Sequence, residues 1–215
     1  MTQWNIELTL STVTAVCAAL APESVAGGSP RAYEWLTQLV AVVIKRHRKR
    51  LDGHFHLLVG TLSAVLQALV TRPYHGGASS GTVKGAGPVR DPAAFPHWEQ
   101  HARRFARLLT LVCEPSAASV TSRAGPNALD SDRDRAKRYA GQYMYLVLMR
   151  YVQLQLDHVV PHAVREALAP GVYAVLDITA PPSLRVMSDA MDVSGRAVMK
   201  ELYRQHQKFG KWSGI

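Results

Sequence analysis

The chain has 215 residues, of which 47% are hydrophobic and 19% charged, and its formal net charge is +9. This composition supports a buried core and excludes a chain that is disordered throughout. No apolar run approaches the roughly 20 residues needed to span a bilayer, and the first residues lack the basic region of an export signal.

The first two predicted helices precede a short basic run. Asn5–Leu20 places most of its apolar residues near one helical face. Arg31–Leu51 follows Ser29 as the N-cap and Pro30 at the first helical position. Its apolar face ends in KRHRKR at Lys45–Arg50. The residues expected to face the core in these two helices are Ile6, Leu10, Val13, Val16, Cys17, Leu20, Leu36, Leu39, Val40 and Val43.

A third helix is predicted after the Asp52-Gly53 turn, because Leu58, Leu62, Val65, Leu66 and Leu69 follow helical spacing closely. The connection to the second helix is short. Since short connections favour antiparallel neighbours, the second and third helices are predicted to form an αα-hairpin.

Two polar stretches flank a fourth helix. The sequence is rich in Gly, Ser and Pro over residues 72–96, and residues 116–135 are polar, so both stretches are predicted to be flexible loops, with disorder around His75–Pro88. Between them, a helix ends before Pro115. Its apolar residues, spaced by four and three, are Trp98, Ala102, Phe105, Leu109 and Val112.

The longest helical pattern, Arg138–Val160, is predicted to be the central helix. Seven apolar residues in succession, Tyr143–Met149, require protein around a helix on nearly all sides. Pro161 ends the pattern. The polar residues fall on one narrow stripe, and they are Gln142, Arg150, Gln153 and Asp157.

The remaining sequence is predicted to form shorter helices separated by Pro170-Gly171 and Pro181-Pro182, with Ser183 and Asp192 as N-caps. Val172–Ile178 could be strand or helix by pattern, and it is assigned to a helix because no second strand could pair with it. A last helix, Val193–Phe209, is expected to turn four residues inward, namely Val198, Met199, Leu202 and Tyr203.

Together these elements predict one all-α domain over residues 1–215. It would contain seven to eight helices in antiparallel pairs, arranged as a compact bundle or as a degenerate, HEAT-like piece of α-solenoid. Cys17 and Cys113 lie far apart inside apolar helical patterns, which predicts reduced core thiols and an intracellular protein.

The sequence offers little that indicates catalysis. His97 and His101 share a helix face at metal-ligand spacing, but Glu99 is misplaced for zincin chemistry and no third ligand is evident. His158 and His162 have the same spacing with Pro161 between them. The five glycines of residues 76–87 lack the Gly-Lys-Ser/Thr of a phosphate-binding loop. We therefore expect no enzyme activity, no metal site and no cofactor.

The basic residues are the best candidates for binding, because the excess positive charge is concentrated in a few stretches. KRHRKR is either a solvated helix end that satisfies carbonyls or a nucleic-acid contact or nuclear targeting signal. The C-terminal KELYRQHQKFGKW either anchors a terminal helix through its aromatics or binds a partner. The residues predicted to bind nucleic acid or an acidic partner are Lys45, Arg46, Arg48, Lys49, Arg50, Arg103, Arg104, Lys208, Lys211 and Trp212.

Four segments, in this order, resemble the C-terminal domain of one protein family. They are RLLTLVCEP at Arg107–Pro115, YVQLQL at Tyr151–Leu156, VREALAPGVYAVLD at Val164–Asp177 and DVSGRAVMKELYRQHQKFGKW at Asp192–Trp212. The family is that of unhealthy-ribosome-biogenesis protein two, also called nucleolar pre-ribosomal-associated protein two. Its members are much larger, so the chain is expected to be a C-terminal fragment.

The resemblance implies a non-catalytic factor in early large-subunit pre-ribosome assembly and pre-rRNA processing, located in the nucleus and nucleolus. It implies partners that include a large helical-repeat protein and a DEAD-box helicase complex, and no membrane. Direct contact with pre-ribosomal RNA stays open. The alternative is a helical RNA-binding domain that acts through the basic stretches.

Overall fold

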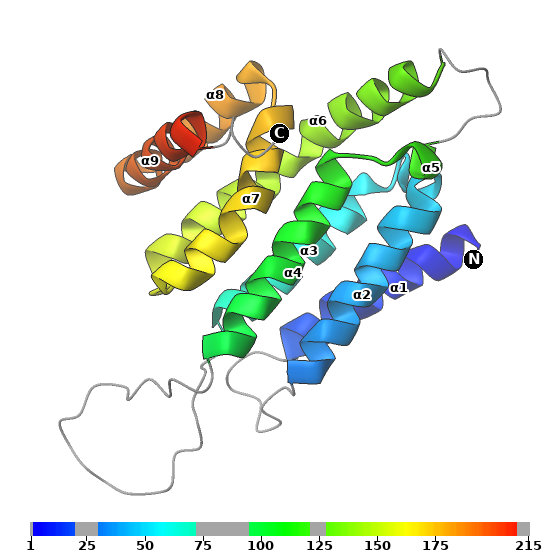
Figure 1. The fold of residues 1–215 in the computed structure, drawn as a ribbon, viewed down its shortest axis with the longest axis horizontal. Coiled ribbons are helices and arrows are strands. Elements are labelled where there is room, and N and C mark those ends of the chain that lie inside the picture. The colour runs from blue at the N-terminus through cyan, green and yellow to red at the C-terminus, as the bar shows by residue number, and fades with distance from the viewer. Residues whose placement is uncertain (1, 20–29, 72–94, 121–127, 210–215) are drawn as a thin grey trace, which may run out of the picture.

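The computed structural model describes residues 2–19, 30–71, 95–120 and 128–209, and these residues fold into helices without a strand (Figure 1). Eight helices have ten residues or more, which confirms the predicted all-α class and helix number for this part of the chain. The elements are α1 (Gln3–Ala19), α2 (Pro30–His47), the 3₁₀ turn η1 (Arg48–Leu51), α3 (Phe55–Thr71), α4 (Phe95–Cys113), α5 (Ala117–Val120), α6 (Ala128–Asp157), α7 (His162–Ile178), α8 (Pro181–Ala190) and α9 (Val193–Phe209).

The helices form two layers. Figure 1 shows α2, α4 and α7 side by side in front of α1, α3 and α6, with α8 and α9 at the α6/α7 end. The chain alternates between the layers, so α1/α2, α3/α4 and α6/α7 are consecutive pairs with one helix in each layer. Trp98 of α4 joins the layers, since its indole Nε1 donates a hydrogen bond of 3.0 Å to the Leu69 carbonyl of α3.

Neighbouring helices within the back layer run parallel. The Thr61 hydroxyl of α3 donates to the Leu10 carbonyl of α1 at 3.2 Å, and Glu7 of the preceding α1 turn lies 3.3 Å from His54. On the other flank, Phe55 at the start of α3 packs against Tyr139 of α6, and Gln67 near the end of α3 accepts a 2.8 Å hydrogen bond from Arg150 of α6. Contacts therefore advance along both helices in the same direction.

The front layer has the same parallel order, and the predicted αα-hairpin of α2 and α3 lies across the two layers, where the Tyr33 hydroxyl donates to the Val65 carbonyl at 3.4 Å. Tyr33 at the start of α2 packs on His101 of α4 at 4.9 Å between ring centroids, whereas Arg48 after α2 reaches Leu111 near the end of α4. The principal partner of α2 is thus α4, and α3 packs mainly on α1 and α6. The pattern had shown which faces were apolar but not which helix each face meets.

Helix α6 is central, as predicted, because it packs against α3, α4, α5, α7, α8 and α9. The predicted polar stripe is exposed or half-buried, and Met144 and Leu148 are buried. Leu146, however, is 41% exposed, so protein does not surround the apolar run completely. The helix begins at Ala128, so the loop predicted over residues 116–135 is wrong for the described residues within α5 and α6.

Helix α7 continues through Pro170, where a break was predicted. Pro170 is exposed, so water can reach the carbonyl that loses its N–H partner. The next residue, Gly171, is buried against α4, and a Cβ placed there would lie 2.6 Å from the Ala106 Cα atom. The close packing of α4 on α7 therefore depends on glycine and holds the helix together across the proline. The prediction that Val172–Ile178 is helical is confirmed.

Several other predictions differ in detail. Ser183 lies inside α8, whose N-cap is Ala180, whereas Asp192 caps α9 as expected through a 2.7 Å hydrogen bond from Gly195 N to Oδ1. Residues 72–94, which hold most of the first predicted loop, lie outside the described residues, as do Leu20 and Ser29. None of the described helices is long and apolar enough to cross a membrane. Predicted core residues that are instead substantially exposed are Val16, Leu39 and Tyr203.

Candidate interaction groove between α2 and α4

A groove of about 690 Å³ runs between α2 and α4 in the front layer. Its position follows from the parallel packing of the two helices, which places the second half of α2 beside the basic segment of α4. The polar groups along it include the Thr37 hydroxyl and the side-chain amides of Gln38 and Gln100. The cations that line it are Lys45 from α2 and Arg103, Arg104 and Arg107 from α4.

Two of these cations are paired with carboxylates outside the lining. Arg103 pairs with Glu99 one turn earlier on α4, and Arg104 pairs with Glu34 of α2 across the helix contact. Lys45 and Arg107 are exposed and have no salt bridge within the described residues. Because exposed ion pairs are weak, the groove presents a net positive surface to an anionic partner.

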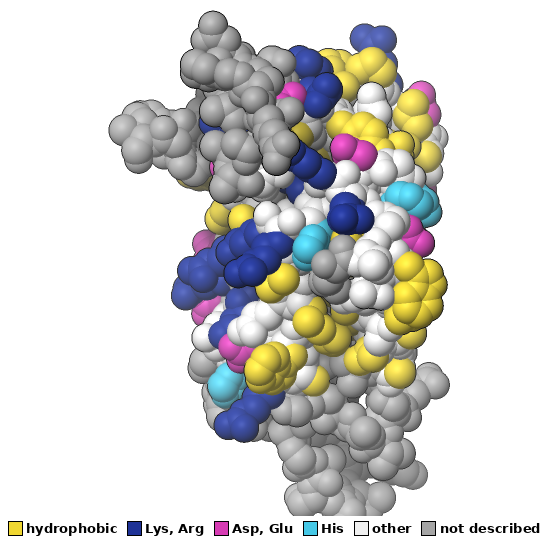
Figure 2. All heavy atoms as spheres, turned by 90° about the vertical axis from the view of Figure 1, so that its right-hand side faces the viewer, with side chains coloured by type: hydrophobic (Ala, Val, Ile, Leu, Met, Phe, Trp, Pro, Cys, Tyr) yellow, Lys and Arg dark blue, Asp and Glu magenta, His cyan; other side chains and the backbone are white. Residues whose placement is uncertain are grey.

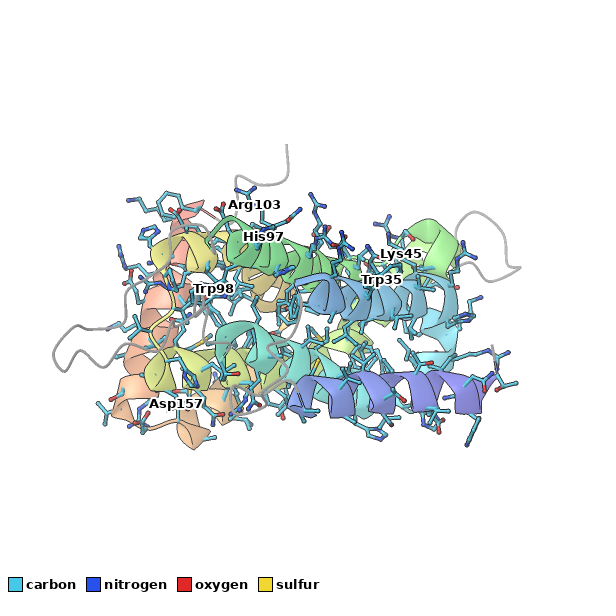
Figure 3. The ribbon with its side chains drawn as sticks, turned by 90° about the horizontal axis from the view of Figure 1, so that it is seen from below. Trp35, Lys45, His97, Trp98, Arg103 and Asp157 are labelled. Carbon is cyan, nitrogen blue, oxygen red and sulfur yellow. The ribbon has the colours of Figure 1, made fainter. Side chains whose placement is uncertain are left out.

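The structure places Lys45, Arg103 and Arg104 together, although the first is more than fifty positions from the others in the sequence. Arg107 completes the set and was not among the predicted binding residues. Its i, i+4 spacing from Arg103 was the available signal, because residues four apart share a helix face. Figure 3 shows Arg103 on the outer side of α4, whereas Trp98 of the same helix points between the layers.

Arg48 departs from the predicted binding role. Its side chain is buried, with Nη1 donating to the Leu111 carbonyl at 3.0 Å and Nη2 to the Val112 carbonyl at 2.6 Å. Burial lowers the pKa of Arg48, while the nearby Cys113 and Asp52 act in the opposite direction. The last carbonyls of a helix have no partner within it, so Arg48 caps the C-terminus of α4. It satisfies carbonyls, as one reading of KRHRKR expected, but those of a different helix.

The rest of KRHRKR spreads in several directions, because α2 gives way to the 3₁₀ turn η1 at Arg48. Lys49 lines a second hollow, of about 380 Å³, formed with α5 and α6. That hollow also contains Asp52 and Asp132, so its charges are mixed. Arg46 and Arg50 are exposed. The six-residue run therefore does not form a single basic surface.

The C-terminal cations are separate from the groove. Lys208 is exposed near the end of α9, where its Nζ lies 5.1 Å from the centroid of the neighbouring Phe209 ring. Helix α9 lies at the opposite end of the molecule from α2 (Figure 1). Lys211 and Trp212 lie outside the described residues.

The histidine pair does not present two ligands on one surface. His97 is exposed, whereas His101 is buried and packs on the Tyr33 ring. Across the described helices, no three His, Cys, Asp or Glu side chains gather in a group that could hold a metal ion.

Comparison with known proteins gives one finding. The family model described as Urb2/Npa2 family matches residues 1–215, which is the whole chain. No curated protein and no solved structure matches the chain.

Proposed function

This chain belongs to the Urb2/Npa2 family, which is associated with ribosome biogenesis, and on that premise we propose that it is a non-catalytic interaction domain in early assembly of the large ribosomal subunit. The whole-length family match is the observation that carries the proposal. Under this proposal the domain acts in pre-rRNA processing within the nucleolus.

The arrangement of the helices supports an interaction role. Consecutive pairs that alternate between two layers, parallel within each layer, have the geometry of a short α-solenoid. Proteins built in this way commonly use extended helical surfaces to bind other proteins. We propose as partners a large helical-repeat protein and a DEAD-box helicase complex of the same pre-ribosome.

Affinity purification from nuclear extract, with the 215-residue chain as bait, tests this proposal. Precursors of the large-subunit rRNA should be enriched over small-subunit precursors and over mature rRNA. The same material should contain other assembly factors. Equal recovery of all RNA classes would contradict a role in large-subunit assembly.

The groove between α2 and α4 favours a second candidate function, direct binding of RNA. Lys45 and Arg107 are exposed cations without a carboxylate partner among the described residues, and the groove is also lined by the side-chain amides of Gln38 and Gln100. Lys and Arg bind phosphates independently of base sequence, and counterion release makes such binding sensitive to salt.

Electrophoretic mobility shift with a single-stranded RNA separates the two candidates. If the groove binds RNA, Lys45→Glu/Arg107→Glu should weaken binding by at least about tenfold and reduce its salt dependence. Arg196→Glu/Lys200→Glu changes the net charge equally at exposed positions of α9 that are not among the predicted binding residues, and it serves as the control. Equal losses from both pairs would indicate a non-specific response to total charge.

A further inference from the structure

Helix α2 has a second apolar face, on the outside of the molecule. Tyr33, Val40 and Ile44 are buried in the core, as one apolar face of a layer helix requires. Trp35, Leu39 and Val42 lie on the other side and are 65%, 46% and 46% exposed. Single exposed hydrophobic residues are ordinary, but three at i, i+4 and i+7 form a continuous stripe along a helix.

This stripe, Trp35–Leu39–Val42, lies where the front layer ends. Helix α4 covers one flank of α2, and no described helix lies along the other flank of α2 in the front layer. Figure 2, which faces the α1/α2 end of the molecule, shows hydrophobic side chains next to Lys and Arg side chains. A helix laid along the stripe would extend the layer in the way that α4 already does on the other side.

The charges around the stripe determine the kind of partner. Arg46 follows Val42 by four residues and continues the stripe, and Arg50 is exposed on the adjoining turn η1. Glu34 is the single carboxylate of residues 30–51, and it is engaged by Arg104 of α4. An apolar stripe that ends in unopposed cations is complementary to an amphipathic helix with carboxylates at one end.

We propose that the Trp35–Leu39–Val42 stripe binds an acidic amphipathic helix of a protein partner. The distance from Trp35 to Arg46 corresponds to eleven residues, or roughly 16 Å of helix, so a partner segment of about three turns would cover it. Its apolar residues contact the stripe, and its acidic end lies over Arg46. RNA suits this surface less well, because Trp35 supplies the one ring of the stripe and Leu39 and Val42 offer none on which a second base could stack. The inference rests on the proposed interaction role and adds to it a surface and a class of partner.

Binding of designed helical peptides to the full chain tests the proposal. One peptide has Leu at i, i+4 and i+7 and Glu at one end, a second has Lys in place of Glu, and a third has the composition of the first in scrambled order. Fluorescence anisotropy should show the first peptide binding at least about tenfold more tightly than the others. Equal affinity for all three peptides would overturn the proposal.

Surface variants show where the peptide binds. Leu39→Ser should weaken binding of the Glu peptide by about tenfold, and Arg46→Glu should do the same, whereas Leu146→Ser should have no effect. Leu146 is a matched control, because it is 41% exposed on α6. All three positions are solvent-accessible, so thermal melts are expected to match wild type. Equal losses from Leu39→Ser and Leu146→Ser would place the peptide elsewhere.

A photo-crosslinking amino acid at position 39 of the full chain, used in nuclear extract, identifies the natural occupant. The expected adduct is a protein segment with helical apolar spacing and acidic residues, read by mass spectrometry. An RNA adduct, a second copy of this chain, or no adduct beyond that formed from position 146 would refute the proposal. Failure here, with large-subunit precursors still recovered by the bait, would leave the assembly role intact. Loss of precursor recovery with peptide binding retained would count against the assembly role alone.

Discussion

Replacement of Arg48 by Met tests whether the buried guanidinium holds the end of α4. Met keeps much of the apolar stem but removes both donors to the Leu111 and Val112 carbonyls. Each hydrogen bond from a charged donor contributes about 1.5–3 kcal/mol. Met also removes the free-energy cost of burying the Arg48 charge, which offsets part of this loss. We expect the free energy of unfolding to fall by about 2–4 kcal/mol.

Thermal unfolding followed by circular dichroism measures this loss. A domain of this size should melt about 4–16 °C lower. Arg46→Met is the control two positions earlier, where the side chain is exposed, and it should change the free energy of unfolding by less than about 0.5 kcal/mol. If the two variants had the same melting temperature, the capping role assigned to Arg48 would be wrong.

Three further predictions concern the core. Leu148→Asp should prevent folding, because it buries a carboxylate and loses packing in a domain stable by about 5–15 kcal/mol, whereas Gln153→Asp should melt like wild type. Gly171→Ala should lower the free energy of unfolding by roughly 2–3 kcal/mol in urea titration, since its Cβ has no room beside α4, whereas Gly60→Ala, with open space, should raise it by about 0.5–1 kcal/mol. Cys17 and Cys113 are both buried, and burial raises the pKa of Cys113, so both thiols should resist a thiol reagent at pH 8 in the native protein and react in denaturant. Fast labelling of the native protein would contradict the buried assignment.

The helices with strict apolar spacing could be predicted from sequence. The five residues that defined α3, from Leu58 to Leu69, are all buried, and so are the five that defined α4. In these segments the apolar side chains contribute chiefly through burial, and periodicity reports burial directly. The polar stripe on α6 could be predicted for the same reason.

Contacts between distant segments could not be predicted in this way. In the sequence, Arg48 cannot be told from the other cations of KRHRKR. Its hydrogen bonds to the end of α4 distinguish it in the structure. The sequence predicts that the helix ends at Pro170. The buried residues on either side, Leu168 and Val172, nevertheless keep α7 continuous. The groove likewise depends on which helix lies beside α2. Local pattern identifies apolar faces, whereas tertiary packing decides which of them meet.

The order of the helix pairs has a consequence for how native structure is lost. Each helix pair packs on the pair before or after it in the chain. Helix α1 packs on α2 and α3 but has no extensive contact with α7 or α9, whereas α4 and α7 share the closest packing in the molecule. Local opening should therefore start at the α1 end and leave the α4/α7 contact until last, so amide hydrogens in α1 would exchange long before those of α7.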